Sequence, residues 1–493
     1  MKNNSWKGSV SIFLVLAFTV ILSLLLTLIE GARQNAIRLK AECAYDLAMQ
    51  SVFAEYNREL LEQYELFFID VTYGNGGNIH CLEDHFKGYL TDNTDLGETY
   101  GLIKDLTAVY PQNVTVDAYS LATDAGGEVL KRQAVGYMKN LYGMDYLKEI
   151  QSELATVEDY DLVERDITSE RLSNQSAIDN FEIPPKKKDA TEDEWEEVEI
   201  DNPADAVNAT RGILSLVIDA DTEISTMAVN PQNYVSGRSL NVGSGLGKRE
   251  GVGAADELIF HEYLLQFCGY YTEPKEEGLL QYQVEYILMG KSSDIDNLKA
   301  IVNRLLLLRE TANVTYLFSD EAKVAEAEAL AATVCAAVAL PELTELVKIS
   351  LLFAWAYAES VYDVKQLLKG GRVPIVKTAE TWHYSLEGML QFTQDGSADV
   401  VEQTADDADT VGASDETIAD GLSYKDYLRV FLALEGSEKK TKRAMDIIEM
   451  DIRKTPGNAG FRLDCCVDRA VITANFASKY GGSCEITREW YYY

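Results

Sequence analysis

The sequence predicts an α+β protein, with an N-terminal transmembrane helix that continues into a stem helix and a helix-rich mixed body with antiparallel C-terminal strands. Three observations support this fold class. The run Ser9–Ile29 is apolar and carries no charge. Several later segments repeat apolar residues every three or four positions, which is the period of a helix. The tail, Arg462–Asn475 and Glu485–Tyr493, alternates with period two around Gly481 and predicts a closing hairpin.

The run 9–29 has the length of a membrane span, because at about 1.5 Å per residue it covers roughly 30 Å. A secretory signal peptide has a shorter apolar core of about 7–15 residues, followed by a cleavage site. Here the run passes directly into more helix. We therefore expect a short leader over 1–8 and an uncleaved single-pass anchor. Its anchoring residues include Ser9, Phe13, Leu16, Val20, Leu24, Leu28 and Ile29.

The helical pattern continues beyond the anchor, and we expect a stem helix over 30–69. Its apolar residues follow one another at intervals of three or four, and its small residues allow another helix to approach closely. The stem either lies against the following domain or stands as a stalk that packs in a bundle. The residues predicted to pack are Ala32, Ala36, Leu39, Cys43 and Leu47.

Turn residues and charge runs divide the rest of the chain. A small α/β region over 70–156 follows the turn cluster Tyr73–Asn78 and contains a strand over Asn113–Leu121. The segment 157–209 is rich in charge and contains Pro184-Pro185, so we expect an acidic flexible linker. The main domain occupies 210–493.

The main domain should be built mostly from helices. Pro341 begins a helix through Leu368 that is apolar almost all round and should be the buried central helix. Ser293 should cap the helix that starts at Asp294. The other predicted elements are a strand over Leu280–Met289, helices over Glu321–Leu340, Tyr424–Leu434 and Lys439–Arg453, and loose stretches over Gly243–Gly253 and Gln394–Asp420.

The composition favours a folded, strongly acidic body. Lys and Arg number 44 against 80 Asp and Glu, a formal net charge of −36. Such a surface repels nucleic acid and suits a body outside the cytoplasm. The 7 cysteines are odd in number and follow no disulfide framework. They are either buried thiols, or Cys484 pairs with Cys465 or Cys466.

Two glycine-containing segments resemble phosphate-binding loops in part. Gly290-Lys291-Ser292 lies before a helix, but Glu285 occupies the place of the first glycine, which must let the backbone wrap the phosphates. Gly243–Lys248 fails similarly, because Val242 holds that place and Arg249 replaces the hydroxyl residue. We expect turns at both segments and no nucleotide.

The metal candidates are equally incomplete. His261-Glu262 begins a zinc-protease motif, but Leu265 stands where the second histidine is needed. The acidic stretch Asp395–Asp420 lacks the spacing of an EF-hand. A denser cluster, which is either a partial zinc site or the amphipathic start of a surface helix, comprises His80, Cys81, Glu83, Asp84 and His85. We expect no catalytic residues, no cofactor and no metal.

The N-terminus resembles a pilin or pseudopilin of the Tad (Flp, tight-adherence) system, most closely a TadE/TadG-like minor component. The shared features are a short basic leader that ends in Gly8 and an apolar helix that continues into a stem. A cleavable prepilin has glutamate five residues after the cleavage point, where this chain has Phe13; the first glutamate is Glu30. We therefore expect no leader processing.

The body resembles an uncharacterised Gram-positive family, domain of unknown function 5702, that is associated with such pilus loci. The matching stretches are Glu285–Asn313, Leu351–Leu368, Val373–Trp382, Gly421–Leu434 and the tail. The resemblance implies a cytoplasmic N-terminus, an extracellular body, and pilins or other pilus-assembly membrane proteins as partners. It supplies no catalytic residues. We expect a non-enzymatic accessory of Tad pilus assembly; the alternatives are a binding or sensing ectodomain unrelated to pili and an ectoenzyme with a dispersed site.

Overall fold

The computed structural model describes residues 5–74, 76, 78–95, 106–142, 165–181, 186–187, 195–196, 201–219, 222–247, 253–395 and 421–492. The fold is α+β, as predicted. The chain forms two compact units. Unit 1 comprises Met1–Tyr137, Gln232–Gly253 and Ile448–Tyr493, and unit 2 comprises Met138–Pro231 and Ala254–Ile447. The predicted continuous main domain over 210–493 is thus divided, because the C-terminal strands pair with strands near the N-terminus.

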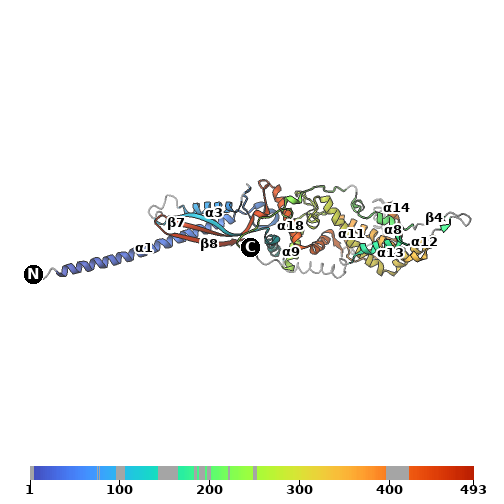
Figure 1. Ribbon diagram of the computed structural model, residues 1–493, viewed down its shortest axis with the longest axis horizontal. Helices are drawn as coiled ribbons and strands as arrows, with labels where there is room; N and C mark the ends of the chain where they lie inside the picture. The colour runs from blue at the N-terminus through green and yellow to red at the C-terminus, as the bar shows by residue number, and fades with distance from the viewer. Residues whose placement is uncertain are drawn as a thin grey trace. The chain divides into compact units, whose positions relative to one another are not determined.

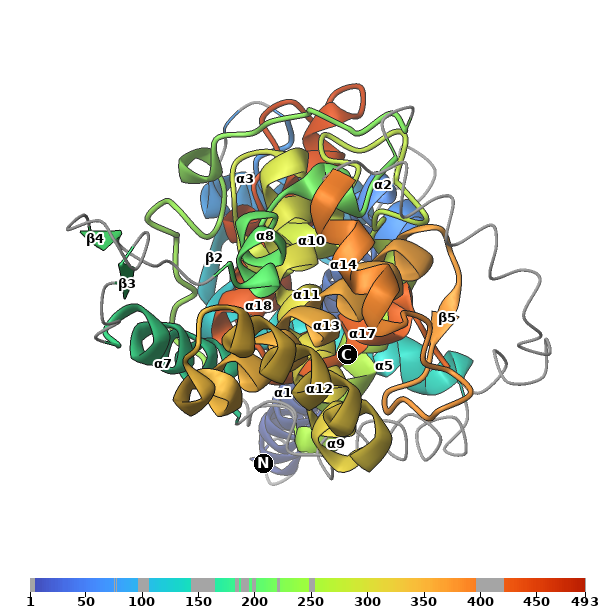
Figure 2. The same ribbon diagram turned by 90° about the vertical axis from the view of Figure 1, so that its right-hand side faces the viewer.

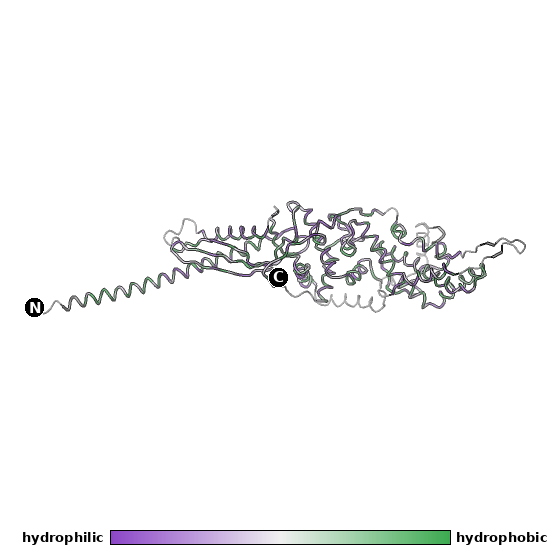
Figure 3. The backbone as a smooth tube through the Cα atoms, in the orientation of Figure 1, coloured by the Kyte–Doolittle hydropathy of each residue, from purple (hydrophilic) through white to green (hydrophobic). Residues whose placement is uncertain are grey.

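Helix α1 (Ser5–Phe53) runs without interruption through the predicted anchor and into the stem (Figures 1 and 3). It is long and apolar enough to cross a membrane. The stem helix is shorter than the predicted 30–69. Asn57 is extended and caps a separate short helix, α2 (Arg58–Tyr64), by accepting a hydrogen bond from the backbone N–H of Leu60. The backbone N–H of Asn57 also bonds to the carbonyl of Phe68, so the chain turns back on itself.

Unit 1 is organised around strand β7 (Cys466–Ser478). It pairs antiparallel with β2 (Val109–Leu121), with β8 (Ser483–Tyr491) and with the short β1 (Ile69–Asp70). The predicted C-terminal hairpin is therefore confirmed. Its turn contains Gly481 and Gly482, whose φ values of 88° and 105° favour glycine.

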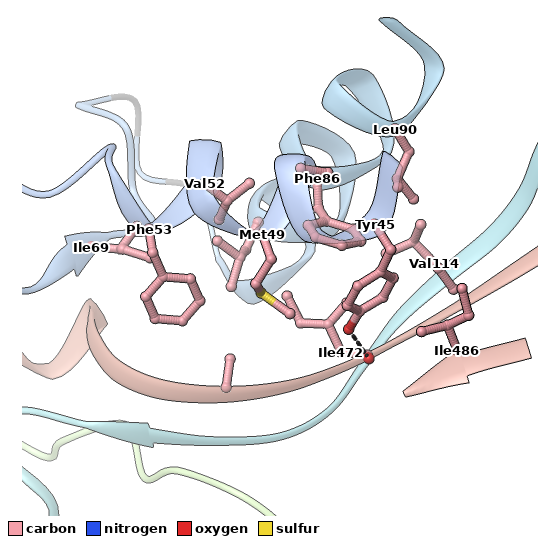
Figure 4. Close-up of a cluster of buried hydrophobic side chains, with 14 of the residues drawn as sticks. Tyr45, Met49, Val52, Phe53, Ile69, Phe86, Leu90, Val114, Ile472 and Ile486 are labelled. Carbon is pink, nitrogen blue, oxygen red and sulfur yellow. Dashed lines mark hydrogen bonds between the residues drawn. The ribbon is translucent and has the colours of Figure 1, made fainter. Parts of the chain in front are cut away.

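Helices α1 and α3 (Ile79–Thr94) pack together beside this sheet (Figure 4). Tyr45 of α1 packs edge-on against Phe86 of α3, with ring centroids 5.2 Å apart. Its hydroxyl donates to the carbonyl of Ile472 at 2.6 Å. Met49 and Val52 are also buried in this core. Each such buried side chain contributes on the order of 1.5–3 kcal/mol, so the second half of α1 is built into unit 1.

The glycine-rich segment around Gly243 lies along strand β2. Tyr119 and Ser244 exchange backbone hydrogen bonds of 2.8 and 3.0 Å. The backbone approach is so close that a Cβ at Gly243 would stand 2.3 Å from the Asp124 carboxylate. The part of the predicted loose stretch that the structure describes is therefore a strap along a strand, and glycine is needed for contact rather than for mobility.

Unit 2 is built around α13 (Thr344–Leu368), which is buried along most of its length, as predicted. The helices that pack against it are α7 (Ile167–Asp179), α8 (Pro203–Ala209), α11 (Asp294–Ser319), α12 (Glu321–Ala337) and α14 (Leu386–Asp395) (Figures 1 and 2). Unit 2 also contains α9 (Ala254–Phe267), α17 (Tyr424–Leu434) and the first part of α18 (Ser437–Lys454). Short strands pair in two places: β3 (Lys186–Lys187) with β4 (Trp195–Glu196), and β5 (Arg372–Val373) with β6 (Leu422–Ser423).

Two sequence predictions for this region are wrong in their described parts. The segment predicted as a strand over Leu280–Met289 forms helix α10 (Gln283–Met289), whose residues are buried on every side, so no polar face reveals the helical period. The predicted linker over 157–209 contains α7 and α8, which bury Ile167, Ile178 and Val207 and contact α13. Residues 143–164 and the acidic stretch 396–420 lie outside the described residues.

The cysteine pairing left open by the sequence is not formed. Cys465, Cys466 and Cys484 are free thiols. On strand β7, Cys466 lies opposite Asp70, whereas Cys484 lies opposite Phe476, which is ten positions further along. At about 3.3 Å per residue this separation is roughly 33 Å, far beyond the reach of a disulfide.

Candidate functional site

Helix α1 has two apolar faces, and one of them is exposed. The face that packs into unit 1 comprises Ile37, Ala41, Ala44, Tyr45, Ala48, Met49 and Val52. The exposed face, which we call the stem stripe, comprises Ala32, Ala36, Leu39, Cys43 and Leu47. Leu39 is 63% exposed and Leu47 is 51% exposed. The residues predicted to pack therefore lie opposite the body of unit 1 and are not covered by it.

The face of α1 that packs into the body was not among the residues predicted to pack. Both sets repeat at intervals of three and four, and each satisfies the helical period. The two faces differ in the size of their side chains. The buried face carries Tyr45 and Met49, which fill space against the sheet, and between them alanines that let neighbouring elements approach closely. This alternation of large and small residues was the feature of the sequence that could have identified the buried face.

The predicted anchor residues lie on the same helix, ahead of the stripe. Phe13, Leu16, Val20, Leu24 and Leu28 are all exposed on α1, as is Ile29, and Ser9 lies in the helix. The hydroxyls in this segment bond back to the helix itself. Those of Thr19, Ser23 and Thr27 donate to the carbonyls of Leu16, Val20 and Ser23 at 2.8, 2.9 and 2.8 Å. The segment consequently presents an apolar surface with satisfied hydroxyl groups, as lipid requires.

The first charges beyond this segment join α1 to the C-terminal hairpin. Arg33 pairs with Glu30 at 2.8 Å. The guanidinium also donates to the hydroxyl of Ser478 at 3.4 Å and to the carbonyl of Gly481 at 3.2 Å. The turn of the closing hairpin is thereby fixed beside the end of the apolar segment.

Unit 2 contains a fully buried ionic cluster that the sequence analysis did not identify. Arg309 of α11 pairs with Asp363 of α13 at 2.9 Å. Lys377 lies 2.7 Å from Asp363 and 2.6 Å from Glu359. Burial alone would raise the pKa of Asp363, but Lys377 and Arg309 hold it below its usual value. The two positive and two negative side chains balance one another within the cluster. Through Lys377, the cluster connects the segment after β5 to helices α11 and α13.

Glu285 is buried without such compensation. Its Oε1 accepts hydrogen bonds from the hydroxyl of Tyr424 at 2.7 Å and from the backbone N–H of Tyr271 at 2.8 Å. Its Oε2 has no partner among the described residues. Burial raises the pKa of this carboxyl to about 7. Glu285 is therefore a packed interior group of α10.

The candidate phosphate loop is a turn between α10 and α11. Gly290 ends α10 with a φ of 65°. The backbone N–H of Lys291 donates to the side chain of Asn297 at 2.8 Å, and Ser293 caps α11 as predicted. The polar groups of this turn are used to join the two helices. The arrangement agrees with the expected serine-capped turn.

The candidate metal ligands do not converge. His261 is buried in α9 and contacts the ammonium of Lys440, and Glu262 pairs with Arg429. In the other cluster, His80 bonds to Glu83 at 2.8 Å, but His85 bonds to Glu55 at 3.1 Å. Both histidines lie on the amphipathic helix α3, which buries Leu82, Phe86 and Leu90. In the part of the chain that the structure describes, no three His, Cys, Asp or Glu side chains are placed to hold a metal ion.

Comparison with known proteins identifies the body of this chain. No curated protein and no solved structure matches it. Residues 193–478 match the model of a family of unknown function, DUF5702. The match covers more than half of the chain, including α13 and strand β7. The chain therefore belongs to the DUF5702 family.

Proposed function

We propose that this protein is a single-pass membrane protein with a cytoplasmic N-terminus and an extracellular body, and that it serves Tad/Flp pilus assembly as a non-enzymatic accessory of the minor pseudopilin type. The observation that carries the proposal is the form of α1. One uninterrupted helix passes from an exposed apolar segment of membrane length into the core of unit 1. Together with the basic leader, this resembles the N-terminal arrangement of pilin-like proteins.

The membrane location is supported by the exposure of the apolar segment. Leaving Phe13, Leu16 and Val20 in water is unfavourable, and a bilayer covers such side chains. The orientation rests on the resemblance to the pilus-associated family. A chain with a formal net charge of −36, nearly all of whose charged residues follow the apolar segment, is suited to having its body on the outer side, where it does not meet nucleic acid.

A non-enzymatic role is supported by how the buried charged groups are used. Arg309, Asp363 and Lys377 satisfy one another and brace the helices of unit 2. Glu262 is paired with Arg429 in the same manner. These groups are engaged in internal contacts and are not presented to a substrate.

An accessory role fits the charge better than that of a filament subunit. Copies of a major pilin pack closely around their hydrophobic helices, and a large acidic body on each would repel its neighbours. Screening over about 8 Å at physiological salt reduces this repulsion without removing it at contact. We place the protein at low copy number at the base or tip of the pilus, or in the membrane platform.

Deletion of the gene tests the pilus role. We expect fewer or shorter pili by electron microscopy, with restoration by the full-length chain. Mass spectrometry of sheared filaments should detect the protein at low abundance, or pull-down from membranes should recover pilus proteins with it. Unchanged pili with no copurifying pilus protein would exclude the role, and recovery of this chain as the dominant filament component would exclude the accessory assignment.

The second candidate is a surface binding or sensing protein unrelated to pili. It is favoured by the extent of the family match, which begins at residue 193 and leaves out α1. The matched region, which includes α13 and β7, can therefore serve on different anchors. Genes for a pilus ATPase and platform protein beside this gene support the first candidate, and their consistent absence across relatives supports the second.

A further inference from the structure

We infer that two copies of this chain pair in parallel through the stem stripe of α1. The inference requires the membrane anchoring of the proposed function but not the pilus role. Its basis is an apolar face that the fold leaves open. Leu39 and Leu47 are 63% and 51% exposed, and Cys43 between them is exposed as well. On the opposite face, Tyr45 and Met49 are buried in the core of unit 1.

Lipid does not cover this stripe. Leu39 and Leu47 lie ten and eighteen residues beyond Ile29, the last residue of the charge-free segment. At 1.5 Å per helical residue these positions are about 15 and 27 Å beyond the hydrocarbon region. An exposed apolar row at that height is more readily explained by a protein neighbour.

The stem stripe is continuous with one face of the membrane segment. This continuity determines how a protein that covers the stripe must run along α1. Going back from Ala32, the exposed residues Leu28, Leu25, Ile21 and Phe18 follow at intervals of three and four. Such intervals keep one face of a helix toward one neighbour along its whole length. The occupant must therefore be a helix that crosses the same membrane and leaves it beside α1.

A second copy of this chain meets both requirements, because its own α1 crosses the same membrane and leaves it at the same height. Related by a two-fold axis along the membrane normal, it presents the same apolar residues at the same height. Ala32 and Ala36 then meet their own counterparts just outside the bilayer, where small residues let two helices approach closely. The body of unit 1 packs on the other face of each helix and does not stand between them.

The charges beside the stripe agree with this pairing. Lys40 lies on one flank and donates to the carbonyl of Thr94, and on the other flank Glu42 pairs with Arg38 and Asp46 pairs with Arg488. In a parallel two-fold pair, each flank of a helix faces the opposite flank of its partner. Lys40 therefore faces a flank on which each carboxylate is paired with an arginine, and the seam brings no two acidic side chains together.

Cys43 supplies a direct test, because pairing brings the two Cys43 thiols together on the seam. The full-length protein is oxidised in membranes with copper phenanthroline and separated on a non-reducing gel. We expect a product of twice the 54.9 kDa chain mass. Cys43→Ser should abolish it while leaving the other cysteines in place. In that variant, Leu39→Cys should restore the product and Arg38→Cys should not, although the Arg38 side chain is 74% exposed.

A second variant pair tests the packing itself. Leu39→Asp with Leu47→Asp should abolish the Cys43 product, and Arg38→Asp, which adds a similar charge away from the seam, should retain it. Both leucines are exposed, so thermal unfolding should be unchanged. Equal crosslinking at Arg38→Cys and Leu39→Cys, an adduct with a different protein, or no product at any position would overturn the pairing. A pair that forms in cells whose pili do not depend on the gene would leave this inference standing while excluding the pilus role.

Discussion

Burial of Glu285 makes the stability of the protein depend on pH. Its pKa is raised from 4.5 to about 7 in the folded chain, so folding favours the protonated form. The stabilising contribution is complete below about pH 4.5 and is lost as the pH rises through 7. At about 1.4 kcal/mol per pH unit, the total change is on the order of 3 kcal/mol.

Glu285→Gln should therefore remove part of the pH dependence of unfolding between pH 4.5 and 7. The measurement is denaturant unfolding of the full chain and the variant at several pH values. The neighbouring ionisable groups include Asp294, Tyr270, Tyr271, Tyr282 and Tyr424, and they remain in both proteins. The difference between the two curves isolates Glu285, and parallel curves would show that its carboxyl is not titrating in this range.

Asp363 should be far more important for folding than a carboxylate in an exposed pair. Asp363→Ala leaves Arg309 and Lys377 with less compensation in the interior, and we expect destabilisation of about 3–5 kcal/mol. The matched control is Glu438→Ala, which removes an exposed pair with Lys442 and should have a far smaller effect, because solvent screens that pair. Denaturant unfolding compares the two, and equal losses would contradict the role assigned to the buried cluster.

Among the helices and strands, those with a clear hydrophobic period or a capping residue could be predicted from the sequence. The central helix α13, the Ser293 cap and the C-terminal hairpin were predicted from residues close in sequence. Helix α10 was missed because its residues are buried on all sides and no polar face reveals the period. The division into two units was missed because β2 and β7 pair across most of the chain, and local periodicity does not specify such partners.

The candidate functional residues also could be predicted only where they lie close together in the sequence. The residues of the stem stripe could be grouped from the sequence because they lie on one helix, and their packing stays a prediction. The cluster of Arg309, Asp363 and Lys377 was not, because its members come from separate segments and meet only in the fold. A partial signal was present: Glu359 and Asp363 lie one turn apart in an otherwise apolar helix, and buried carboxylates require cationic partners.

The N-terminal end of α1 should retain its leader. Prepilin peptidases act before a helix with glutamate at its fifth position, and this chain has Phe13 there. N-terminal sequencing of protein extracted from membranes should begin at or beside Met1. The control is a pilin from the same cells, which should lack its leader. A chain that begins at Ser9 would show that the peptidase accepts Phe13, and one that begins beyond Ile29 would show a cleaved signal sequence.

At the scale of the whole molecule, composition and α1 act together. In the proposed arrangement the apolar segment anchors the chain in the membrane, and the strongly acidic composition repels acidic surfaces. Each of the two units buries its own apolar core.

The most direct test of this account is the location of the body. Protease is added to intact, wall-stripped cells, and the protein is followed with antibodies against unit 2 and against a cytoplasmic marker. We predict that the body is degraded while the marker survives, and that a short N-terminal fragment containing α1 stays in the membrane pellet. Full protection of the body in intact cells, with degradation after lysis, would contradict the account.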